Sequence, residues 1–215
     1  HWQHLYRMSP FRGTALAGAV SAIDIALWDI KGKHYQAPVW DLLGGNCRDK
    51  IRLHLLGGGG TPETMNEAAR NAVEEGFTAL KFDPVHHIDT GIDRMVKQAV
   101  DLVAAAREGG GPDLDIIIEV HRKLTPMTAL TLAEALKPFN LYFFEDPIQI
   151  DSIQTQGEIA RRTSVPVGNG ERLTTIWEFR ELLEGGGPQY VRPDVGLAGG
   201  LTHCKKIAAI AESYH

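Results

Sequence analysis

The sequence predicts an α/β fold, a (β/α) barrel of which this chain holds about six βα units. Three observations predict it. From Ile51 onward, short apolar runs alternate with helical patterns of ten to eighteen residues, and glycines stand where those helices should end. The apolar runs do not alternate with polar residues, as is typical of parallel strands covered on both faces. The 165 residues from position 51 give about 27 residues per unit, close to the roughly 30 of an eight-unit barrel.

The same spacing predicts that the natural protein is longer than this sequence. Two more units would close the barrel and would need roughly 55 residues. A six-stranded arc would instead leave two strands as bare edges. We therefore expect residues 51–215 to form a barrel domain that is incomplete at its C-terminal end.

The elements are predicted in order from hydrophobic periodicity. Residues 14–33 carry apolar side chains at steps of three and four, which predicts a long amphipathic helix that ends near Gly32. Its apolar face consists of Leu16, Val20, Ile23, Leu27 and Ile30. Strands are then predicted at residues 51–56, 78–82, 116–120, 141–144, 165–167 and 190–192. Helices are predicted to begin near residues 62, 92, 126, 153, 175 and 201, the last one after a glycine-rich helix start at 196–200.

Composition and charge exclude several classes of protein. The chain is 43% hydrophobic with a net charge of -5, which indicates a globular protein without the basic surface that nucleic-acid binding needs. It contains no apolar stretch of membrane-helix length and no N-terminal signal pattern. Cys47 and Cys204 fit neither a disulfide framework nor a zinc spacing. We expect a cytoplasmic protein with no nucleic-acid and no membrane partner.

Three glutamates follow apolar runs at the ends of the third, fourth and fifth predicted strands. Glu119, Glu145 and Glu171 recur at intervals of 26 residues, which is one βα unit. Side chains at the C-terminal ends of barrel strands converge at the mouth, where active sites lie. Three carboxylates there would repel one another unless a cation neutralised them, and oxygen-only ligands suit Mg²⁺ better than zinc. The alternative, that each glutamate is a solvated or helix-capping residue, explains the equal spacing less well.

The segment from Ala19 to Gly45, AVSAIDIALWDIKGKHYQAPVWDLLGG, is long and specific. Together with the carboxylate spacing, it resembles the mandelate racemase and muconate lactonizing group of the enolase superfamily. The resemblance covers nearly the whole chain and implies that the three glutamates are Mg²⁺ ligands, although the first is commonly Asp in that family. It also implies that residues 1–50 are the tail end of an N-terminal α+β capping domain with a linker helix. A homo-oligomer, commonly a dimer or an octamer, is implied as well.

Two residues near the later strand ends gain roles from this resemblance. Asp194 ends the sixth predicted strand, where the family places the Asp that orients a catalytic His on a seventh strand, expected beyond His215. The alternative is an Asp that caps the next helix. Arg172, beside Glu171, is expected to contact the substrate or to pair behind the metal ligands.

The second strand departs from the racemases of the group, which carry Lys-x-Lys there. This chain has Lys81-Phe82-Asp83, so one of the two bases is missing. The resemblance leaves Lys81 a catalytic role in binding the substrate carboxylate or a developing charge, and a salt-bridged lysine is the alternative. Asp83 is expected either to bind a substrate hydroxyl or to begin the loop before Pro84.

The third strand supplies a histidine instead. His121 stands two residues after Glu119, so strand alternation is expected to place it on the same face, aimed into the barrel mouth. The arrangement resembles the acid-sugar dehydratases, in which a third-strand histidine is the general acid for a departing hydroxyl. A structural histidine is the alternative.

The resemblance implies a Mg²⁺-dependent lyase, an acid-sugar dehydratase that acts on a small-molecule sugar acid, an aldonate such as D-galactonate. Removing the proton α to a carboxylate creates charge that a metal stabilises, and His121 would protonate the next hydroxyl because hydroxide is a poor leaving group. The product would be a 2-keto-3-deoxy sugar acid. The alternatives are a hydroxy-acid racemase or epimerase of the same family, a homologue that binds a sugar acid without turning it over, and a structural (β/α) protein.

Overall fold

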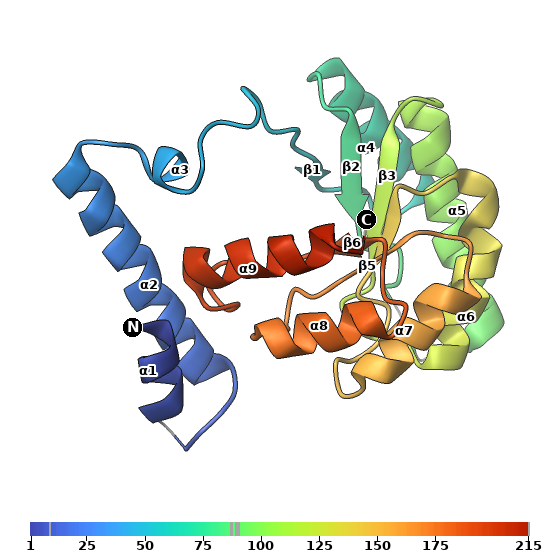
Figure 1. Cartoon of the computed structure of the whole chain (residues 1–215). Helices are drawn as coiled ribbons and strands as arrows, with labels where there is room; N and C mark the ends of the chain where they lie inside the picture. The colour runs from blue at the N-terminus through green and yellow to red at the C-terminus, as the bar shows by residue number, and fades with distance from the viewer. Residues whose placement is uncertain (9, 87, 89–90, 215) are drawn as a thin grey trace. The chain divides into compact units, whose positions relative to one another are not determined.

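The computed structural model of the chain describes residues 1–8, 10–86, 88 and 91–214. Six strands form one sheet in the order β1-β2-β3-β4-β5-β6, and the pairings from β1 to β5 are parallel (Figure 1). Among the described residues no pairing joins β6 back to β1, so the sheet is open. The strands are β1 (Leu55–Leu56), β2 (Ala79–Phe82), β3 (Asp115–Glu119), β4 (Phe143–Glu145), β5 (Val167–Asn169) and β6 (Tyr190–Val191). The predicted α/β fold with six βα units is confirmed.

A helix follows every strand, and each begins within one residue of its predicted start. These helices are α4 (Pro62–Glu74), α5 (Ile92–Gly110), α6 (Pro126–Leu136) with the 3-10 turn η1 (Lys137–Phe139), α7 (Ile153–Arg162), α8 (Ile176–Glu184) and α9 (Gly200–Glu212). For α4 and α6, residues at the helix start explain where the helix begins. Thr61 and Thr125 each cap their helix through a reciprocal bond with a threonine three residues on, and a proline follows at the first helical position.

Three strands begin two or more residues later than predicted: β1 at Leu55 instead of residue 51, β4 at Phe143 instead of residue 141, and β5 at Val167 instead of residue 165. A local cause is visible for β5. Pro166 precedes it and has no N–H to give to a strand ladder. The Val165 N–H is instead held by the Thr163 hydroxyl at 3.0 Å. The paired strand therefore starts only after the proline.

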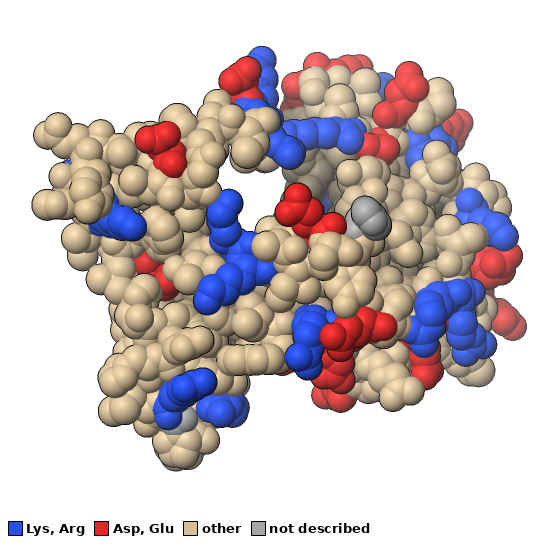
Figure 2. All heavy atoms as spheres, in the orientation of Figure 1, with Lys and Arg blue, Asp and Glu red and all other residues tan. Residues whose placement is uncertain are grey.

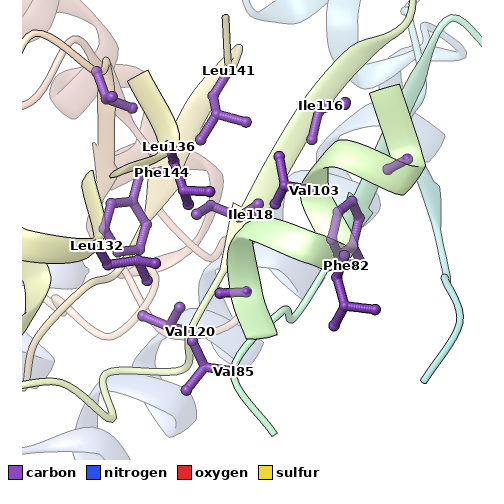
Figure 3. Close-up of a cluster of buried hydrophobic side chains, with 14 of the residues drawn as sticks. Phe82, Val85, Val103, Ile116, Ile118, Val120, Leu132, Leu136, Leu141 and Phe144 are labelled. Carbon is purple, nitrogen blue, oxygen red and sulfur yellow. The ribbon is translucent and has the colours of Figure 1, made fainter. Parts of the chain in front are cut away.

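The chain forms two compact units. The first unit comprises residues 1–51, 170–184 and 191–215, and the second comprises residues 52–169 and 185–190. The second unit holds β1 to β5 with helices α4 to α7, and consecutive helices pack against one another. Its core lies between the sheet and the helices (Figure 3), with side chains from β2, β3, β4, α5 and α6 such as Phe82, Val103, Ile116, Ile118, Leu132, Leu136 and Phe144.

The first unit contains α1 (Trp2–Met8), α2 (Thr14–Tyr35), α3 (Val39–Leu42), α8 and α9. Backbone N–H groups at the start of α9 donate hydrogen bonds to polar side chains of α2. The Ser21 hydroxyl accepts the Gly199 N–H and the buried Asp24 carboxylate accepts the Thr202 N–H, both at 2.9 Å. Gly200 has a φ of +75°, and a Cβ there would lie 2.5 Å from Asp24 Oδ2. The glycine-rich run is therefore the start of α9, as predicted, and it lets two helices approach closely.

This contact corrects the expectation for the apolar face of α2. The helix itself is confirmed, and Val20 is only 3% exposed. However, Ile23, Leu27 and Ile30 are 44%, 40% and 60% exposed. The buried side of α2 runs instead through Ser21 and Asp24, because the backbone N–H groups at the start of α9 need oxygen acceptors.

The described helices include none with the length and apolarity needed to cross a bilayer. On the face drawn in Figure 2, acidic and basic side chains are interspersed rather than gathered by sign. That face offers no broad basic area for a polyanion.

Candidate active site

Strand alternation in the second unit places three charged side chains on the face of the sheet that turns away from the helices. Leu80 and Phe82, and likewise Ile118, point into the helix-covered core. Lys81 lies between the first two, and Glu119 follows the third. Side chains alternate along a strand, so Lys81 and Glu119 face the opposite side, as Glu145 does beside the core residue Phe144. This opposite face is the inner face of a barrel.

Lys81 forms ion pairs with both glutamates. Its Nζ lies 2.7 Å from Glu119 Oε2 and 2.6 Å from Glu145 Oε2. The three side chains are only 8%, 8% and 1% exposed. Two buried carboxylates side by side would be costly without a cation, and the Lys81 ammonium supplies one positive charge between them. The salt-bridged lysine of the sequence analysis is therefore what the structure shows, at the predicted ligands themselves.

His121 lies beside this cluster, but strand alternation is not the reason. Strand β3 ends at Glu119, and His121 and Arg122 both have positive φ, 51° and 63°. The Lys123 N–H donates to the Val120 carbonyl at 3.1 Å, which closes a tight turn. Left-handed conformations cost non-glycine residues about 1–2 kcal/mol each, so the surrounding contacts hold this turn.

The turn directs the two ring nitrogens of His121 to two different carboxylates. Nδ1 lies 2.8 Å from Asp83 Oδ2, and Nε2 lies 3.6 Å from Glu119 Oε1. Lys123 Nζ lies 2.7 Å from the same Asp83 oxygen. The structure thus brings together Lys81, Asp83, Glu119, His121 and Glu145, all within the second unit.

A second network, which was not predicted from the sequence, fixes the segments that follow these strands. The Asp146 carboxylate accepts bonds from Arg122 Nη1 at 2.5 Å and from Asn169 Nδ2 at 3.3 Å. The Arg122 N–H also donates to the Asp146 carbonyl at 2.9 Å. These bonds link the residues after β3 and β4 to the end of β5. The acidic pair Glu145-Asp146 before Pro147 was the available sequence signal.

Glu171, Arg172 and Asp194 belong to the first unit. Arg172 Nη2 lies 3.5 Å from Glu171 Oε1, a pairing of an exposed arginine with a half-buried glutamate. Asp194 Oδ1 accepts the Gly196 N–H at 2.7 Å, whereas the N-cap residue of α9 is Gly199. Asp194 therefore closes its own turn and does not cap the helix. A cavity of about 440 Å³ is lined by Glu171, Val191, Arg192, Pro193 and Asp194.

The donor chemistry of Glu119 and Glu145 fits a hard divalent cation. The two residues are register partners at the ends of β3 and β4, and their carboxylates offer only oxygen ligands in a buried place. In the described part of the chain, no three His, Cys, Asp or Glu side chains are grouped closely enough to hold a metal ion. The third predicted ligand, Glu171, lies in the other unit and stays a prediction.

Comparison with known proteins assigns the family. Residues 1–44 match the N-terminal domain of mandelate racemase / muconate lactonizing enzyme, and residues 64–215 match the enolase C-terminal domain-like family. The chain belongs to the enolase superfamily. A D-galactonate dehydratase of Cronobacter sakazakii is 37% identical to this chain over 215 residues, which are 99% of this chain and 56% of that protein. The chain thus spans about half the length of this curated relative.

Solved structures of the superfamily show the same fold. A member of the enolase superfamily from Salmonella Typhimurium has a TM-score of 0.94 at 30% identity, over 99% of this chain and 61% of that one. A 3,6-anhydro-D-galactonate cycloisomerase from Zobellia galactanivorans has a TM-score of 0.87 at 33% identity, over 99% and 59%. A dehydratase and a cycloisomerase thus share this fold, so the fold does not decide the reaction.

Proposed function

We propose that the protein is a Mg²⁺-dependent acid-sugar dehydratase, a lyase that converts an aldonate such as D-galactonate to a 2-keto-3-deoxy sugar acid. The observation that carries this proposal is the position of His121 beside the buried pair of Glu119 and Glu145. Carboxylates that suit a divalent cation, next to a ring that can donate a proton, are what elimination from a hydroxy acid requires. The identity to a D-galactonate dehydratase supports the choice of substrate class.

Glu119, Glu145 and Glu171 would hold the metal. When bound, Mg²⁺ supplies positive charge that stabilises the negative charge developing on the substrate carboxylate, as in enolase-type sites generally. Lys81 is proposed to share in this neutralisation, because its ammonium already lies between two of the three carboxylates. Arg172 is proposed to contact the substrate.

Two histidines are proposed to divide the proton transfers. A base, proposed to be a histidine of a seventh strand oriented by Asp194, removes the proton from the carbon α to the carboxylate. His121 donates a proton to the hydroxyl on the next carbon, the carbon–oxygen bond breaks, and water leaves. The electron pair of the broken C–H bond forms the carbon–carbon double bond, and the resulting enol tautomerises to the 2-keto acid. In this sequence of steps, His121 acts after the α-proton has been removed, when the hydroxyl leaves.

The test uses the full-length protein with Mg²⁺ and a panel of aldonic and aldaric acids, with detection of 2-keto-3-deoxy acids. We expect one sugar acid to be dehydrated. His121→Asn should lower kcat by about 10²- to 10⁴-fold, the usual contribution of a general acid. The same variant should still exchange the α-proton with deuterated water, because the base is intact.

Other outcomes would overturn the proposal. Epimerised or cyclised product without loss of water would identify another reaction of the superfamily. Failure of the whole panel in both dehydration and α-proton exchange would indicate a homologue that does not catalyse. Full dehydration by His121→Asn would remove His121 from the mechanism. Glu145→Gln, compared with the exposed Glu134→Gln on α6, tests the metal site separately by Mg²⁺ titration calorimetry.

A further inference from the structure

Both carboxylate oxygens of Asp83 form hydrogen bonds with other residues of the chain. Oδ2 accepts from Lys123 Nζ at 2.7 Å and lies 2.8 Å from His121 Nδ1. Oδ1 accepts the Val85 N–H at 2.9 Å. Three of roughly four acceptor positions of this carboxylate are therefore engaged. A substrate hydroxyl would find little left to bind, so the contacts disfavour the role of Asp83 as a substrate ligand.

The partner of His121 Nδ1 decides where the ring carries its proton. An ionised carboxylate can only accept a hydrogen bond, so Nδ1 must be the donor to Asp83. In the neutral ring the proton then sits on Nδ1 and leaves Nε2 without one. Nε2 is the nitrogen on the Glu119 side, 3.6 Å from Oε1. If His121 gives a proton to a ligand beside Glu119, that proton therefore comes from Nε2. The neutral ring that remains carries its proton on Nδ1, where it donates to Asp83.

The turn that carries His121, together with Lys123, holds the histidine ring next to Asp83. His121 sits in the tight turn of two left-handed residues, and its side chain is 55% exposed, so packing alone does not hold the ring. Lys123, at the end of the same turn, binds Asp83 and also donates to the Val85 carbonyl. These bonds fasten the turn after β3 to the loop after β2. Of the two carboxylates beside the ring, Asp83 lies within hydrogen-bond distance, whereas Glu119 lies 3.6 Å away.

We propose that Asp83 is a positioning residue for His121, which fixes its Nδ1–H tautomer and directs Nε2 toward the Glu119–Glu145 cluster. The proposal deepens the proposed function, since it rests on His121 as the general acid. Lys123 has a lesser part, because it holds the carboxylate but does not touch the ring in any contact of the described residues.

The first readout does not depend on activity. In the full-length protein labelled with ¹⁵N-histidine, the ring nitrogens of His121 are assigned by comparison with His121→Asn and observed at a pH at which the ring is neutral. We expect the Nδ1–H tautomer in the wild type, and a shift toward the Nε2–H tautomer in Asp83→Ala. Asp83→Asn keeps an oxygen acceptor and should retain part of the preference. Lys123→Met should leave the tautomer unchanged.

The second readout separates positioning from substrate binding. Asp83→Ala should lower kcat by about 10- to 100-fold, the usual effect of losing a group that orients a catalytic ligand, with little change in KM. A raised KM with unchanged kcat would mean that Asp83 touches the substrate, and it would overturn the proposal, as would an unchanged tautomer in Asp83→Ala. If the wild type dehydrates no sugar acid, the proposed function fails, and the tautomer experiment still decides the role of Asp83.

Discussion

Glu119 and Glu145 are register partners, each the last residue of its strand, and the Lys81 ammonium lies within 2.7 Å of a carboxylate oxygen of both. Two anions at neighbouring strand ends repel, and burial strengthens the repulsion because little water screens it. A positive charge between them is therefore a structural requirement. Lys81 meets this requirement within the chain itself.

Replacing Lys81 with methionine should make the fold depend on a divalent cation. Lys81→Met leaves two buried carboxylates without their shared cation, and removing one partner of a buried ion pair costs about 3–5 kcal/mol of unfolding free energy. Added Mg²⁺ should restore part of this loss, since a ligand that binds only the folded state stabilises it. Thermal unfolding with and without MgCl₂ measures both effects.

The matched control is Lys97→Met, because Lys97 makes a comparable 2.6 Å ion pair with Asp101 on the exposed surface of α5. Exposed pairs contribute about 0–1 kcal/mol, so this variant should unfold like the wild type. A Lys81→Met protein that is as stable as the wild type, or that gains no more from Mg²⁺ than the wild type does, would contradict the expectation.

Replacing Arg107 with methionine should destabilise the second unit without touching the site. The Arg107 guanidinium donates to five main-chain carbonyls, those of Gly111, Pro112 and Leu114 between α5 and β3 and those of Phe139 and Asn140 at the end of η1. Burial lowers the pKa of this guanidinium, and the charge of Asp115 opposes that shift. Arg107→Met removes all of these hydrogen bonds and should cost about 2–4 kcal/mol in urea unfolding. Arg94→Met, at an exposed position of the same helix, should cost less than about 0.5 kcal/mol.

Much of the fold was predictable because its signals are local. Parallel strands buried on both faces show as unbroken apolar runs, and the isoleucines at 116–118 in β3 are indeed buried. Proline and threonine at helix starts fixed where α4 and α6 begin, and both starts were predicted to the residue. The spacing of Glu119 and Glu145 predicted a pair of strand ends, and register pairing confirms that the two residues are opposite one another.

The remaining features depend on contacts between distant residues. Alternation predicted the position of His121 for the wrong reason, because the strand had already ended and a left-handed turn carries the ring. The buried side of α2 could not be recognised from apolar periodicity. Its Ser21 and Asp24 side chains are buried because their oxygen atoms accept hydrogen bonds from N–H groups at the start of α9. The hydrogen bond that Asn169 Nδ2 donates to Asp146 joins the end of β5 to the residue after β4 and leaves no pattern in the sequence.

The two cysteines should differ sharply in reactivity. Burial raises the pKa of the Cys204 thiol to about 11, with the charges of Asp194 and Asp24 acting in the same direction, whereas Cys47 is exposed. Because the thiolate is the reactive form, Cys204 should react slowly near neutral pH and Cys47 fast. A disulfide-exchange reagent should show one fast phase in the native protein. Cys47→Ser should abolish the phase and Cys204→Ser should keep it, and the reverse pattern would refute the assignment.

His203 should make the first unit sensitive to acid. Its ring is 1% exposed and stacks on Trp2 with the ring centroids 3.3 Å apart. Burial, assisted by the positive charge of Lys206 and opposed by Asp24, lowers the pKa of His203 from 6.5 to about 4. Between pH 6.5 and about pH 4, the unfolded chain therefore binds a proton at His203, whereas the ring stays neutral in the folded chain. The associated stability is fully present above pH 6.5 and is lost as the pH falls toward 4.

The size of this effect follows from the shift, since each pKa unit corresponds to about 1.4 kcal/mol. Between neutral pH and about pH 5, His203 should cost the fold on the order of 2 kcal/mol of unfolding free energy. Urea unfolding of the wild type and of His203→Phe at both pH values isolates this contribution, because every other titrating group is common to the two proteins. The phenylalanine ring preserves the stacking on Trp2 but binds no proton, so the variant should lose less stability on acidification. Equal losses in the two proteins would mean that His203 is protonated in the folded state.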